Sequence, residues 1–77
     1  MSEQNQIIFM QARLLRLASA RWNVSIQDAN RIFDKHHVFE FIRDCFGIFH
    51  TEGDEAVLDD IMLMINNQGA EIDAGVI

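Results

Sequence analysis

The chain has no proline, no tyrosine and a single cysteine, Cys45, among its 77 residues. A lone cysteine excludes an intramolecular disulfide, and such sparing use of cysteine is typical of reducing compartments, so we expect a cytoplasmic protein. No segment approaches the roughly 20 consecutive apolar residues of a membrane-spanning helix. Residues 1–6 lack the basic start of a secretory signal peptide, so we expect neither export nor membrane association.

Positive charge is also scarce. Six Lys and Arg residues stand against twelve Asp and Glu, for a formal net charge of -6, and residues 51–77 contain seven acids and no base. Nonspecific nucleic-acid binding depends on a basic surface that displaces phosphate counterions, so we do not expect nucleic acid as a partner. An acidic surface instead suits solubility and a protein partner with a basic surface.

Helical periodicity dominates the sequence, since apolar residues recur at three- and four-residue steps. The pattern predicts helices over about 4–22, from a Ser25 N-cap to Asp34 or Lys35, over 38–46, and from a Thr51 cap to about Asn67. Gly47 is expected to end the third helix, leaving residues 48–49 as a link. The predicted fold is all-α: a small bundle of three to four short helices in one domain, residues 1–69, followed by a flexible tail, residues 70–77.

The core should be rich in aromatic residues, because six Phe and one Trp must supply much of the buried area in so short a chain. Residues on the inward face of each predicted helix should be buried, notably Phe33, Phe39, Ile42 and Ile61. The same periodicity places Ile26 on the inward face of the second helix.

Residues that could carry chemistry are few. His36, His37, His50 and Cys45 lack the spacing of zinc ligands, so we expect no metal and no cofactor. Cys45 with His50 could form a nucleophile and base, but an apolar helix face favours an inert, packed thiol. No glycine-rich phosphate loop is present. We therefore expect a protein that is not an enzyme, in which His50 and Thr51 shape the turn before the last helix.

Two exposed patterns suggest a binding surface. On the first helix, Phe9 falls outside the apolar arc and shares a stripe with Arg13 and Arg16. On the last helix, Leu63 lies opposite the inward face, close to two acids, Asp59 and Asp60. Exposed apolar residues framed by charge are typical of protein contact sites, so these six residues are our candidate partner-binding residues.

Five segments in order resemble a known family: residues 24–29, 32–35, 38–44, 49–53 and 57–61. Together they are similar to a short bacterial family catalogued as domain of unknown function 3791, over about residues 7–66. The His-Thr-x-Gly step from His50, followed by the Asp-Ile step at Asp60, is its most specific part. The family usually has tyrosines along the first and third helices, where this chain has Phe46, Phe49 and no tyrosine.

The resemblance implies a partner but no activity. Members are often encoded beside proteins that resemble ADP-ribosyltransferase-type toxins, which implies an antitoxin-like or accessory role in a toxin–antitoxin system. Our first hypothesis is thus a non-catalytic interaction module that binds a neighbouring toxin-like protein or a second copy of itself as a homodimer. The alternative is a small helical DNA-binding regulator, in which Gln27, Asn30 and Arg31 of the second helix would face the bases.

Overall fold

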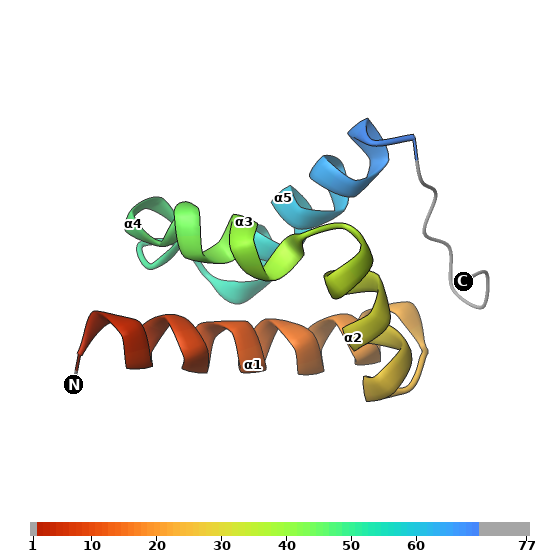
Figure 1. Cartoon of the computed structure of the whole chain (residues 1–77), viewed down its shortest axis with the longest axis horizontal. Helices are drawn as coiled ribbons and strands as arrows, with labels where there is room; N and C mark the ends of the chain where they lie inside the picture. The colour runs from red at the N-terminus through yellow and green to blue at the C-terminus, as the bar shows by residue number, and fades with distance from the viewer. Residues whose placement is uncertain (1, 70–77) are drawn as a thin grey trace.

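The computed structural model describes residues 2–69, which form five α-helices (Figure 1). They are α1 (Glu3–Trp22), α2 (Ile26–Lys35), α3 (Val38–Asp44), α4 (Phe46–Phe49) and α5 (Asp54–Asn67). The predicted all-α fold is confirmed, and α4 is the helix that the sequence pattern did not predict. The tail expected at residues 70–77 lies outside the described residues.

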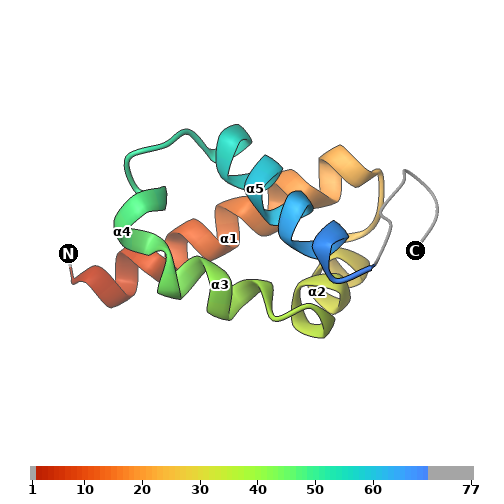
Figure 2. The ribbon, with the colours of Figure 1, turned by 90° about the horizontal axis from the view of Figure 1, so that it is seen from above.

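The longest helix, α1, is the base on which the other helices pack. It contacts α2, α3 and α5, and α2 in turn contacts α3. Figure 1 shows α3, α4 and α5 on one side of α1, and Figure 2 shows α3–α4 and α5 as two arms that lie above it. The space between these two arms, on the side away from α1, is where the candidate site is found.

A polar N-cap starts α2, as the sequence predicts, and a polar residue ends α1. The Ser25 hydroxyl accepts a hydrogen bond from the Asp28 amide at 3.0 Å, which confirms Ser25 as the N-cap of α2. Asn23 adopts a left-handed conformation, with φ 56°, at the end of α1. Asparagine tolerates this conformation better than most residues, so it allows the sharp turn into α2.

The expectations around Gly47 and Thr51 are wrong. The α3 helix ends at Asp44, and a further helical turn, α4, includes Gly47 instead of stopping there. The last helix begins at Asp54 with Gly53 as its N-cap, so Thr51 does not cap it. The physical reason is burial: Phe46 and Phe49 are only 6% and 4% exposed, and the turn through Gly47 places both rings against the core.

The core combines all five helices and is confirmed as aromatic-rich, with Phe33, Ile42 and Ile61 fully buried. Phe39 is partly buried, not buried as predicted: it packs at the margin of the core, in a T-shaped contact with Phe33. Ile26 is exposed, against expectation: as the first residue of α2 it precedes the turn that packs on α1. The remaining buried apolar side chains are Met10, Leu14, Ala18, Trp22, Ala29, Ile32, Val38, Phe46, Phe49, Val57, Leu58 and Ile65.

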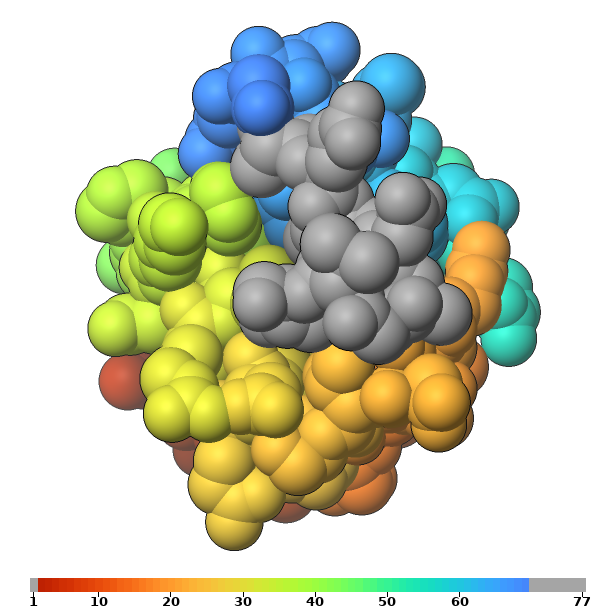
Figure 3. All heavy atoms as spheres, turned by 90° about the vertical axis from the view of Figure 1, so that its right-hand side faces the viewer, coloured from red at the N-terminus to blue at the C-terminus, as the bar shows by residue number. Residues whose placement is uncertain are grey.

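A polar contact joins the C-terminal ends of α2 and α5. Figure 3 views the molecule from this end, where atoms of α2 border the last turns of α1. His36 follows α2, and its Nδ1 lies 2.9 Å from Oε1 of Gln68, directly after α5. The Gln68 amide also donates to the backbone carbonyl of His36. These bonds fix the C-terminal end of α5 relative to α2.

Candidate functional site

The potential metal ligands of the described residues do not gather at one place. Within residues 2–69, no three His, Cys, Asp or Glu side chains gather in a group that could hold a metal ion. In the same part of the chain, no helix combines the length and apolar character needed to cross a membrane. The candidate site consists of exposed apolar and charged side chains.

His50 and Thr51 both bond to the backbone of α4. His50 Nδ1 lies 2.9 Å from the Phe46 carbonyl oxygen, to which the Nδ1-protonated tautomer donates, and its ring stacks on Phe46. The Thr51 hydroxyl donates to the Ile48 carbonyl at 2.7 Å. Each of these carbonyls also accepts a backbone amide, from His50 at 2.9 Å and from Thr51 at 3.2 Å, so the two side chains add a second bond at the end of α4. Cys45 lies between α3 and α4 and is partly buried.

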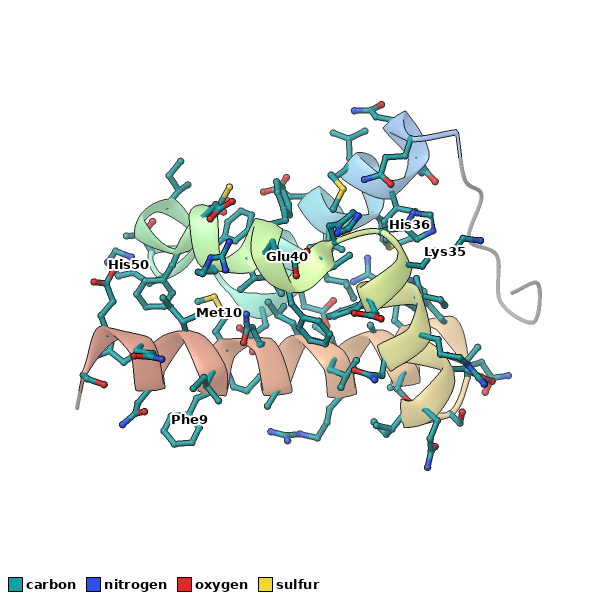
Figure 4. All side chains as sticks on the ribbon, in the orientation of Figure 1. Phe9, Met10, Lys35, His36, Glu40 and His50 are labelled. Atoms are coloured by element: carbon teal, nitrogen blue, oxygen red, sulfur yellow. The ribbon has the colours of Figure 1, made fainter. Side chains whose placement is uncertain are left out.

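The candidate residues on α1 do not act as one stripe. Phe9 is 52% exposed and points away from the other helices, whereas its neighbour Met10 points toward them (Figure 4). Arg13 forms an ion pair with Asp54 of α5, with Nε 3.1 Å from Oδ2. Arg16 is exposed and has no ion-pair partner among the described residues. Arg13 thus joins two helices of the same chain.

The candidate residues on α5 also fall into two groups. Asp59 forms an ion pair with Arg21 of α1, and the same guanidinium bonds Glu55 at 2.7 Å. Asp60 and Leu63, in contrast, line a groove. Asp59 therefore connects α5 to α1, and Asp60 and Leu63 remain available on the surface.

The groove runs between α3–α4 and α5 and has a volume of about 530 Å³. Its two most exposed apolar side chains, Ile48 at 67% and Leu63 at 59%, are also the most exposed large hydrophobic residues of the described chain. They come from opposite walls, Ile48 from α4 and Leu63 from α5. The groove is lined by Phe41, Cys45, Ile48, Phe49, Asp60, Leu63, Met64, Asn67 and Gln68.

Sequence reasoning identified one wall of this groove in part and missed the other. Asp60 and Leu63 were candidates, but Ile48 was assigned to a link, because Gly47 was expected to end the helix. A signal was present: residues 41, 45, 48 and 49 are spaced as one helical face, provided that the helix continues through Gly47.

The residues considered for DNA binding lie on α2. Gln27, Asn30 and Arg31 are exposed, and Arg31 forms an ion pair with Asp28 one turn earlier on the same helix. Because its guanidinium already holds a carboxylate, Arg31 is partly neutralised on this surface. Lys35, one turn after Arg31, is the other cation of α2, and the two acids of the helix, Asp28 and Asp34, offset both cations, so α2 carries no net positive charge.

Comparison with known proteins identifies a family. No curated protein and no solved structure shows significant similarity to the chain. A family model described as "Protein of unknown function (DUF3791)" matches residues 9–68, which include α2 to α5, the part of α1 from Phe9 onward and every residue that lines the groove. The chain belongs to the DUF3791 family.

Proposed function

We propose that the protein is a non-catalytic interaction module that binds a partner protein in the groove between α3–α4 and α5. The observation that carries the proposal is the pair Ile48 and Leu63, the two most exposed large hydrophobic side chains, on facing walls of one groove. Apolar side chains gathered in a concave surface favour docking, whereas isolated exposed ones are ordinary. Burial of such anchors supplies most of the affinity in many protein interfaces.

The partner we propose is a toxin-like protein encoded beside this one, in a cytoplasmic toxin–antitoxin system in which this chain is the antitoxin-like or accessory component. This part of the proposal rests on what the family resemblance implies about the neighbouring genes. The acidic chain, with its net charge of -6, suits such a partner if the partner's contact surface is basic.

The test is co-expression with the product of the adjacent gene, followed by affinity capture and calorimetry. Leu63→Glu and Ile48→Glu should each weaken binding by at least about tenfold, because either places a charge in an apolar contact. Ile8→Glu is the matched control, since Ile8 is 51% exposed on α1, outside the groove. Circular dichroism should show that all three variants keep the helical fold.

A fourth variant tests the candidate surface on α1. Phe9→Ala combined with Arg16→Glu changes that surface and leaves the Arg13–Asp54 ion pair in place. If this double variant loses the partner and the groove variants keep it, α1 is the contact surface and the groove assignment is wrong. If no variant of either surface affects an observed complex, both assignments fail.

A further inference from the structure

The charges on α5 are not equally available to a partner. Three of its acids, Asp54, Glu55 and Asp59, form ion pairs with Arg13 and Arg21 of α1. The fourth acid of the helix, Asp60, has no ion-pair partner within residues 2–69, and it lines the groove. The one acid of α5 without an ion pair among the described residues therefore lies where a docked partner would contact it.

Among the described residues, no cation lines the groove. Its other polar side chains are Asn67 and Gln68 at the C-terminal end of α5, and the rest of the lining is apolar or the Cys45 thiol. A partner with an acidic group opposite Asp60 would be repelled, and one with a cation there would be attracted. The charge complementarity of the site thus specifies a basic group.

The walls of the groove specify the shape of the occupant. On one wall residues 60, 63, 64 and 67 follow the spacing i, i+3, i+4, i+7 along α5. On the other, residues 41, 45, 48 and 49 have the same kind of spacing through α3 and α4. Two such helical ridges, each about 10 Å long, form a groove into which a third helix packs its own ridge of side chains.

We propose that the groove receives an amphipathic helix of the partner protein, with apolar side chains at i, i+3 or i+4, and i+7, and a Lys or Arg opposite Asp60. This inference rests on the proposed function and names the partner's contact chemistry. The apolar face of the helix covers Ile48 and Leu63, in the helix-in-groove mode of recognition. The cation steers association and sets the register, and the apolar anchors slow dissociation.

The experiment uses two synthetic, fluorescently labelled amphipathic peptides: one of Leu and Lys, and one in which Glu replaces every Lys. Fluorescence anisotropy measures their dissociation constants, and amide NMR spectra of the protein locate the binding surface. The Leu/Lys peptide should bind at least about tenfold more tightly, with shifts concentrated at Cys45, Ile48, Leu63 and Met64.

Two charge reversals make the test specific. Asp60→Lys should weaken binding of the Leu/Lys peptide by about fivefold or more and strengthen binding of the Leu/Glu peptide. Glu52→Lys is the matched control: it changes the net charge equally, but Glu52 is exposed outside the groove and should alter binding less than about twofold. Leu63→Ala should weaken the binding of both peptides.

Three results would overturn the inference. Equal effects of Asp60→Lys and Glu52→Lys would mean that the peptide senses only net charge. A natural complex that Leu63→Glu disrupts but Asp60→Lys leaves intact would refute the basic helix while the proposed function stands. Self-association that both Leu63→Glu and Phe9→Ala abolish, measured by sedimentation, would mean that the groove receives a second copy of the chain.

Discussion

Replacing Phe33 with leucine tests how the core connects three helices. Phe33 of α2 is fully buried, and its ring makes edge-to-face contacts with Trp22 of α1 and Phe39 of α3, at centroid distances of 5.9 and 5.3 Å. Leucine retains most of the apolar area but cannot form either contact. Phe33→Leu should therefore weaken the packing of α2 on both neighbours.

The magnitude follows from these two contacts. Each aromatic pair contributes about 0.5–1.5 kcal/mol beyond its buried area, so Phe33→Leu should lower the free energy of unfolding by about 1–3 kcal/mol. A chain of 77 residues has a total stability of about 4–12 kcal/mol. Phe39→Leu removes one of the two contacts at a partly buried position, and should cost about half as much.

Urea unfolding followed by far-UV circular dichroism measures both free energies, and unchanged m-values would show that the comparison is valid. For a domain of this size, each kcal/mol lowers the melting temperature by about 4–8 °C, which gives a second measurement. If Phe39→Leu destabilises the protein as much as Phe33→Leu, or if Phe33→Leu has no measurable effect, Phe33 is not the central contact between these helices.

Three further variants test local features by the same measurements. Ser25→Ala removes the N-cap bond to Asp28 and should cost about 1 kcal/mol. Arg21→Ala breaks exposed ion pairs to α5 and should cost less than about 1 kcal/mol in dilute buffer; a loss that persists in high salt would contradict an electrostatic role. Gly47→Ala should stabilise the protein by about 0.4–1 kcal/mol, because Gly47 lies in α4 and an added Cβ meets no atom within 4 Å. A loss of stability would show that Gly47 is needed for the turn between α3 and α4.

The sequence predicts those parts of the fold that depend on neighbouring residues. Ser25 caps a helix through an amide three residues away, and the apolar period of α5 places Ile61 in the core. The α4 helix was missed because the helix-ending preference of Gly47 is a local effect of about 1 kcal/mol. Burial of Phe46 and Phe49 contributes about 1.5–3 kcal/mol each, which outweighs that preference. Only the folded chain brings those rings to the core.

The candidate site could be predicted only in part, for the same reason. The period of a single helix predicts that Leu63 points outward, but it does not tell what lies beside it. The second wall depends on α4, which carries Ile48 to a position facing α5. The ion pairs of Arg13 and Arg21 join residues at least 34 positions apart, and they separate Asp59 from Asp60, two neighbours that the sequence treats alike. One acid fastens α5 to α1, and the other is left at the groove, so the tertiary contacts of α1 select which charge a partner can use.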